Sequence, residues 1–96
     1  MLTGKQKRFL RAKAHHLDSI FQVGKGGVNE NLIKQVGDAL EARELIKVSI
    51  LQNCDEDKQT VADKLQEGAQ ANIVQVIGKT IVLYKESKRN KQIELP

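Results

Sequence analysis

The sequence is poor in the residues on which disulfide, thiol and base-stacking chemistry depend. It holds one cysteine, no tryptophan and three aromatic residues, namely Phe9, Phe21 and Tyr84. A lone thiol, Cys54, cannot form an internal disulfide, so we expect the protein in a reducing, cytoplasmic compartment. Three scattered rings do not favour a sheet that reads nucleic-acid bases by aromatic stacking.

Long apolar runs and catalytic constellations are also missing. No run approaches the ~18 apolar residues of a membrane-spanning helix, and the N-terminal segment has no apolar stretch of the secretory-signal type. No nucleophile, base and orienting group can be assembled, and Cys54 has no base to activate it. We therefore expect no membrane association, no enzymatic activity, no cofactor and no small-molecule substrate.

Two adjacent histidines, His15 and His16, invite a metal site. Neighbouring residues of a helix point about 100° apart, so the two imidazoles cannot face one ion. No further ligands lie at the spacing of a known metal site. We predict surface or structural histidines, whose place at the end of a helix leaves them able to contact a phosphate.

Charge is abundant and unevenly distributed along the chain. The net charge is +4, and charged residues make up 29% of the sequence. Residues 1–34 and 79–96 carry an excess of lysine and arginine, whereas residues 35–78 carry an excess of aspartate and glutamate. This bipolar pattern predicts a basic surface for a polyanion and an acidic surface elsewhere. A protein–protein adaptor that docks a basic partner on the acidic segment is the alternative.

The basic N-terminal part contains a glycine-rich turn, Gly24-Lys25-Gly26-Gly27. The apolar run Ile20 to Val23 predicts a strand before it, and Asn29 is a good N-cap for a helix after it. Glycines let the backbone approach a ligand closely, and the helix adds unpaired N–H groups and the positive end of its dipole. With the charge of Lys25, the turn offers the chemistry for binding an anionic backbone. A plain strand-to-helix turn is the alternative.

Apolar residues at helical spacing predict three helices. The first begins at a capping box and runs to about His15, with a buried stripe of Leu10, Ala14 and Leu17. The second runs over about residues 30–42. The third is expected to be capped by Asn53 or Asp55, with Asp55, Glu56 and Asp57 in its first turn. Its apolar stripe comprises Val61, Ala62, Leu65 and Ala69.

Strands are predicted at 20–23, 45–51, 73–77 and 80–84. The last two form a hairpin around Gly78-Lys79, which suits a type II′ turn and pairs Ile77 with Thr80. In that register one hairpin face is wholly apolar and the other is mixed; the apolar residues are Val74, Val76, Ile81 and Leu83.

The order α-β-α-β-α-β-β predicts an α/β fold with a mixed four-stranded sheet, and the length predicts one domain over residues 1–96. We expect the second and third helices on the apolar face of the sheet. The mixed face is expected to be partly exposed to solvent, or partly covered by the first helix. Residues 85–96 form a basic tail whose end is expected to pack locally.

Several stretches together resemble the CRM domain, the chloroplast RNA splicing and ribosome maturation family. They are Leu2-Thr3, Arg11-Ala12-Lys13-Ala14-His15, Gln22-Val23-Gly24-Lys25-Gly26-Gly27-Val28, Glu44-Leu45-Ile46-Lys47-Val48 and Ile93-Glu94-Leu95-Pro96. The resemblance covers nearly the whole chain and is to the stand-alone bacterial form. It implies a fold similar to the C-terminal domain of translation initiation factor three, and RNA binding through the Gly-x-x-Gly loop and adjoining basic surface. Bacterial members of the family are associated with precursors of the large ribosomal subunit.

We therefore predict a non-enzymatic RNA-binding protein of ribosome assembly, whose partner is large-subunit ribosomal RNA or a pre-ribosomal particle. On the first helix, Lys7, Arg8 and Arg11 cluster as a cationic ridge. The predicted RNA contacts are Gly24, Lys25, Gly26, Gly27, Val28, Asn29, Lys5, Lys7, Arg8, Arg11, Lys13, Lys34 and Lys79. Phosphate contacts position RNA without reading its sequence, so specificity is expected from RNA shape.

Overall fold

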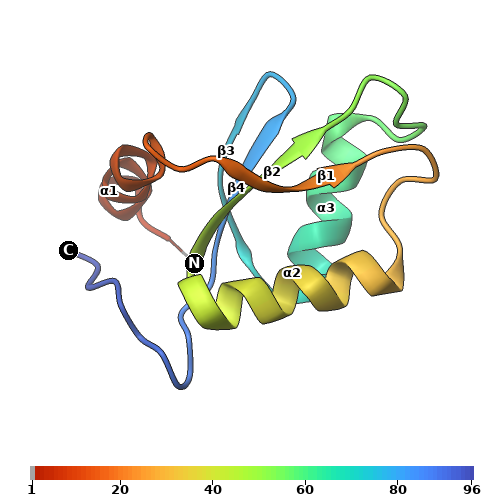
Figure 1. The fold of residues 1–96 in the computed structure, drawn as a ribbon. Helices are drawn as coiled ribbons and strands as arrows, with labels where there is room; N and C mark the ends of the chain where they lie inside the picture. Colours follow the sequence, from red (N-terminus) through yellow and green to blue (C-terminus); the bar gives the residue numbers. More distant parts are fainter. Residues whose placement is uncertain (1) are drawn as a thin grey trace.

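A computed structural model describes residues 2–96. Within this range the helices and strands follow the predicted order α-β-α-β-α-β-β (Figure 1). Their bounds are α1 Gly4–Ala14, β1 Ser19–Val23, α2 Glu30–Arg43, β2 Leu45–Ile50, α3 Lys58–Ala69, β3 Asn72–Ile77 and β4 Thr80–Tyr84. None of the helices in the described part of the chain has the length and apolar character that a bilayer crossing requires.

The four strands form one mixed sheet in the order β1-β2-β4-β3. β1 and β2 are parallel and are joined by α2, while β4 is antiparallel to both β2 and β3. The β3–β4 hairpin turns at Gly78, whose φ is +54°, and pairs Ile77 with Thr80 as predicted. Val23 at the end of β1 lies beside Ile50 at the end of β2. The loop after β1 and the hairpin turn therefore lie at the same end of the sheet.

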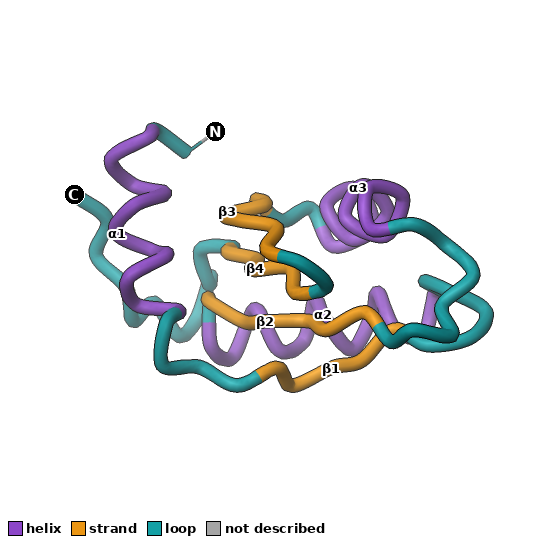
Figure 2. The backbone as a smooth tube through the Cα atoms, turned by 90° about the horizontal axis from the view of Figure 1, so that it is seen from above, coloured by secondary structure: helices purple, strands orange, loops and turns teal. Residues whose placement is uncertain are grey.

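Helices lie on both faces of the sheet (Figure 2), with α2 and α3 together on one face as predicted. α2 and α3 pack on one face through a core that includes the fully buried Leu40, Leu65 and Ile81. α1 packs on the other face, where Leu10 and Ala14 contribute to a smaller core. The sheet is thus the middle layer, and α1 is separated from the other two helices by it.

The prediction that Leu17 completes the buried stripe of α1 is wrong. The Leu17 side chain is 38% exposed. α1 ends at Ala14, so Leu17 lies in the connection to β1 and no longer follows the helical period that buries Leu10.

The prediction that Val74 belongs to the apolar hairpin face is also wrong, because β3 contains a bulge. β3 pairs with β4 at Ile73 and again at Gln75, but the partner strand advances by only one residue between them. Val74 is the extra residue, and a bulge of this kind changes the face on which the next side chains lie. Val74 is buried in the core under α1, while Ile73 packs against the α2–α3 core.

α3 begins later than predicted. Asp57 caps it in place of Asn53 or Asp55, and its Oδ1 accepts a hydrogen bond from the amide of Thr60 at 2.8 Å. The carboxylate satisfies one of the amide groups that the first helical turn leaves without a partner. Glu56 consequently precedes the helix and stands in the connection that follows β2.

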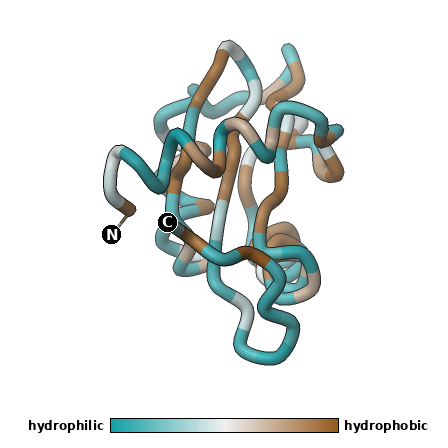
Figure 3. The backbone as a smooth tube through the Cα atoms, turned by 90° about the vertical axis from the view of Figure 1, so that its left-hand side faces the viewer, coloured by the Kyte–Doolittle hydropathy of each residue, from teal (hydrophilic) through white to brown (hydrophobic). Residues whose placement is uncertain are grey.

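The basic tail, residues 85–96, packs against the body of the protein at its end, as predicted. The buried carboxylate of Glu44 accepts the Ile93 amide at 2.7 Å, together with two other tail amides. The side chain of Ile93 is buried in the core under α1. Near the end of the chain, Gln6 of α1 donates to the carbonyl of Pro96 at 3.3 Å. Figure 3 shows α1 and the C-terminal end of the chain on the same side of the molecule.

Candidate nucleic-acid interface

The loop between β1 and α2 adopts a conformation that favours glycine. The Gly27 amide donates to the Gly24 carbonyl at 3.1 Å and closes a turn. Gly26 and Gly27 have φ of +94° and +69°, values that residues with a Cβ rarely adopt. Asn29 then caps α2, because its Oδ1 accepts the Leu32 amide at 2.8 Å. Two consecutive positive-φ residues thus lead the chain from the strand to the helix N-terminus.

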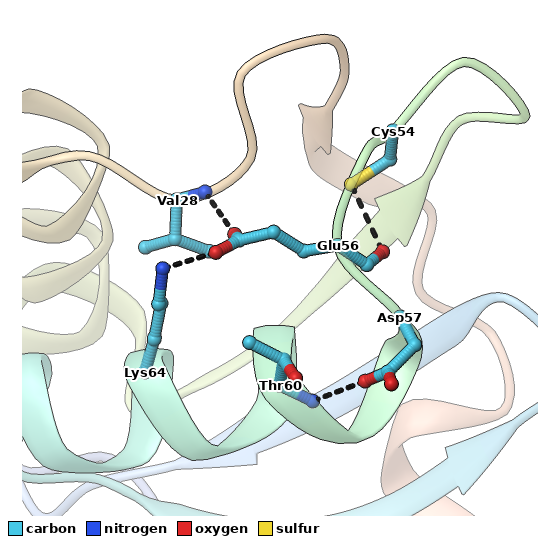
Figure 4. Close-up of polar contacts among 6 residues, drawn as sticks. All are labelled: Val28, Cys54, Glu56, Asp57, Thr60 and Lys64. Carbon is cyan, nitrogen blue, oxygen red and sulfur yellow. Dashed lines mark hydrogen bonds and ion pairs between the residues drawn. The ribbon is translucent and has the colours of Figure 1, made fainter.

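A carboxylate from outside the loop holds it in place (Figure 4). One oxygen of Glu56 accepts the Val28 amide at 2.8 Å, and the other pairs with Lys64 of α3. The hydrogen bond from Lys64, and then that from Val28, hold the pKa of Glu56 below its ordinary value. A Cβ on Gly27 would overlap this carboxylate. Glycine is therefore favoured at position 27 both by its φ and by the closeness of Glu56.

The backbone donors of the loop are divided between the interior and the solvent. The Gly27 amide bonds within the turn, the Val28 amide bonds to Glu56, and the Val28 side chain is buried. The amides of Lys25 and Gly26 donate to no acceptor within residues 2–96, and both residues are exposed. We expected the Val28 amide to bind a phosphate, but it is already bonded to Glu56. Lys25 and Gly26 instead present two amides and one ammonium beside a helix N-terminus.

The basic residues of α1 lie far from this loop. Figures 1 and 2 view the molecule from directions 90° apart, and both place α1 at one end and the β1–α2 loop at the other. The longest dimension of the molecule is 37 Å. On α1, the exposed basic residues are Lys5, Arg8, Arg11 and Lys13, and Lys7 is half-buried. The structure therefore does not bring the ridge and the loop together in one compact patch.

The two remaining predicted contacts differ in their surroundings. Lys79 is exposed at the hairpin turn, and its carbonyl accepts the Ile50 amide at 2.7 Å. This bond keeps Lys79 at the end of the sheet where the β1–α2 loop lies. Lys34 lies on the solvent side of α2 and pairs with Asp38 at 3.5 Å, so its charge is partly neutralised.

The adjacent histidines are exposed and follow the end of α1, so the helical spacing assumed for them does not apply. Their ring centroids are 5.2 Å apart in an edge-to-face arrangement, with ring planes at 79°, and the two rings line different pockets. His15 lines one pocket with Arg11 and Lys47, and His16 lines another with Lys13. Within residues 2–96, no three side chains of the metal-binding types gather closely enough to hold an ion.

Sequence reasoning missed two residues near the predicted contacts, Glu56 and Lys47. The signal for Glu56 is the spacing of Asp57 and Thr60, since a cap at Asp57 leaves Glu56 outside the helix. The signal for Lys47 is the alternation of β2, because its apolar neighbours face the α2–α3 core and turn Lys47 to the opposite face.

Comparison with known proteins agrees with this architecture. Residues 2–85 match the CRS1 / YhbY (CRM) domain. The chain is 75% identical over 96 residues to a protein of Bacillus subtilis (strain 168) named "Probable RNA-binding protein YqeI", with 100% of both chains covered. It is 38% identical over 95 residues to a Haemophilus influenzae protein named "RNA-binding protein", with 99% of this chain and 95% of that one covered. The solution structure of the protein SAV1595 from Staphylococcus aureus has a TM-score of 0.82 and 62% identity, again over 100% of both chains. On these grounds, the chain belongs to the CRS1/YhbY (CRM) domain family.

Proposed function

We propose that this protein binds ribosomal RNA in precursors of the large ribosomal subunit and acts in ribosome assembly in the cytoplasm. Family membership and the names of two relatives support RNA as the ligand class. The observation that carries the proposal is the outward side of the β1–α2 loop. There, Lys25 and Gly26 offer amides that have no acceptor within the described chain, next to the N-terminus of α2. Such groups fit a phosphate of the RNA backbone.

In this mechanism a phosphate approaches the loop at Gly26, where even an added Cβ would meet no atom within 4 Å. The two free amides donate to its oxygens, the Lys25 ammonium adds a full charge, and the dipole of α2 favours the anion. Glu56 holds the loop in shape through Val28 before the RNA arrives. Little conformational entropy is then lost on binding.

The adaptor alternative finds less support, because several acids of the middle segment are already engaged. Glu41 and Glu44 accept hydrogen bonds from the C-terminal tail. Glu56 holds the β1–α2 loop and Asp57 caps α3. Carboxylates with these internal partners do not form a free acidic surface for a basic protein.

Gly26→Asp and Gly26→Asn form a matched pair that tests the loop. Asp and Asn are similar in size and tolerate positive φ better than most residues, so the two variants should fold equally well. Only Asp places a negative charge where the phosphate is proposed to bind. We expect Gly26→Asp to bind a labelled fragment of large-subunit ribosomal RNA at least about tenfold more weakly than Gly26→Asn, as measured by fluorescence anisotropy. Equal affinities for the two variants would exclude the loop as a phosphate site.

The ribosomal part of the proposal is tested in cells. Ultraviolet crosslinking of the full chain, followed by sequencing of the bound RNA, is expected to recover large-subunit ribosomal RNA. The Gly26→Asp variant should recover much less of it. Crosslinks confined to other RNAs would keep RNA binding and reject the role in ribosome assembly.

A further inference from the structure

A second basic site lies between α1 and the sheet. Its pocket of ≈ 240 Å³ is lined by Arg11 and His15 from α1 and its C-cap, by Lys47 of β2, and by Gln75 and Thr80 of the hairpin. Its lining within the described chain includes two cations and an imidazole but no carboxylate. Pockets for small molecules measure about 300–1,000 Å³. A pocket of this size and charge suits a phosphate or a ribose of a polymer better than a whole small-molecule ligand.

Lys47 is positioned to serve this pocket. Its ammonium donates to the carbonyl of Leu17 at 2.9 Å, in the connection between α1 and β1. This bond uses one of the three N–H donors of the ammonium and leaves two. The full positive charge of Lys47 therefore stays available at the wall of the pocket.

The register of the sheet shows where the pocket leads. Side chains alternate along a strand, so Lys47 and Ser49 of β2 share the face that α1 partly covers. Ser49 pairs with Thr80 of β4 and with Gln22 of β1, and directly paired residues lie on one face. Polar side chains thus run from the pocket across the sheet to Gln22. Gln22 stands two positions before Gly24, where the β1–α2 loop begins.

Both ends of this polar strip carry residues already proposed to bind RNA. Arg11 belongs to the ridge on α1, and Lys25 belongs to the loop. Lys79, at the hairpin turn, immediately precedes Thr80 in the sequence. Figures 1 and 2 both place the hairpin turn between α1 and the loop.

We infer that one RNA strand runs from the α1 ridge, through this pocket and across the polar strip, to the β1–α2 loop. Lys47 and His15 contact a phosphate or ribose on the way, and Gln75 and Thr80 supply hydrogen bonds. The inference rests on the proposed RNA binding and extends it. It explains how the ridge and the loop, at opposite ends of the molecule, hold the same ligand.

Gln75→Glu is the sharpest test of the pocket. It keeps the size of the side chain and places a carboxylate beside Arg11 and Lys47, which the fold should tolerate because the charges are opposite. Gln66→Glu makes the same change at an exposed position of α3, on the other side of the sheet. With a labelled fragment of large-subunit ribosomal RNA, we expect Gln75→Glu to weaken binding at least about tenfold and Gln66→Glu by less than about twofold. Lys47→Gln should reduce the slope of log affinity against log salt by about one contact.

The outcomes separate this inference from the proposed function. Loss of affinity in Gln75→Glu, with an unchanged melting temperature, supports the path across the sheet. If the wild-type protein binds the RNA, and Gln75→Glu and Lys47→Gln bind it equally tightly, the path is wrong while the loop proposal stands. If the wild-type protein does not bind the RNA, both proposals are wrong.

Discussion

Alanine substitutions at Gly26 and Gly27, made one at a time, separate the two constraints on the β1–α2 loop. Both residues have positive φ. A Cβ on Gly26 would meet no atom within 4 Å, whereas one on Gly27 would overlap the Glu56 carboxylate. The Glu56 side chain is flexible and can move away. Moving it breaks the hydrogen bond with Val28 and the ion pair with Lys64.

Backbone strain alone predicts that Gly26→Ala is the more destabilising variant. The left-handed region centres near φ of about +57°, and Gly26 at +94° lies further from that value than Gly27 at +69°. An L residue in this region costs roughly 1–2 kcal/mol, and each kcal/mol lowers the melting temperature of a domain of this size by about 4–8 °C. Gly26→Ala should therefore lower the melting temperature by about 4–16 °C. The lost Glu56 contacts add to the strain at Gly27, so we expect Gly27→Ala to be the worse of the two.

Thermal denaturation followed by circular dichroism measures this order. Gly37→Ala is the control, because Gly37 lies within α2 and has open space around its Cβ position. There alanine should stabilise the protein by roughly 0.5–1 kcal/mol. A second control introduces Gly27→Ala into a Glu56→Ala background, where its cost should shrink to that of backbone strain.

Two results would refute the reasoning. Gly26→Ala could prove more destabilising than Gly27→Ala, or Gly27→Ala could cost the same with and without Glu56. Either result would mean that Glu56 does not hold the loop.

Three further predictions concern charge. Each phosphate contact contributes roughly 0.7–0.9 to the slope of log affinity against log salt, so roughly four to seven contacts give a slope of about −3 to −6. A flat salt titration on ribosomal RNA would exclude the electrostatic mechanism. Replacing Lys7, Arg8 and Arg11 together by alanine should weaken RNA binding with little change in melting temperature, since Arg8 and Arg11 are exposed, Lys7 is only half-buried, and surface charges contribute little to folding. A large fall in melting temperature at unchanged affinity would make these residues structural. Hydrogen bonds from the Ser87 hydroxyl and two tail amides lower the pKa of Glu41 from 4.5 to about 2. The resulting stability is present above about pH 4.5 and is lost as the pH falls toward 2, so Glu41→Gln should flatten the decline of melting temperature in acid, and identical pH profiles would contradict this role.

Local sequence patterns were sufficient to predict most elements and the existence of the loop. Thr3 and Asn29 cap helices through amides three residues away, and Gly78 forms the hairpin turn between adjacent strands. Such interactions join residues that are close in the chain, so the order of residue types reveals them. The order of the elements then restricted the sheet to a few topologies, including the observed one.

Contacts between distant parts of the chain were not predictable in this way. Glu56 bonds to Val28 across 28 positions, and the predicted cap at Asn53 or Asp55 would have placed it inside α3. The bulge at Val74 changes the faces on which Ile73 and Val74 lie within a regular apolar alternation. Both features depend on where packing places the backbone, and no local pattern records that position.

The separate contributions of the sequence and of the tertiary structure are clearest at the candidate interface. The sequence by itself determined a cationic, glycine-rich turn between a strand and a helix, because glycine, lysine and an N-cap follow one another in the chain. Only the tertiary structure decided that the Val28 amide is taken by Glu56, which comes from another element, while the amides of Lys25 and Gly26 find no acceptor within residues 2–96. It also decided that α1 and the loop lie at opposite ends of the molecule, because α1 packs across the sheet from α2, whose N-terminus follows the loop.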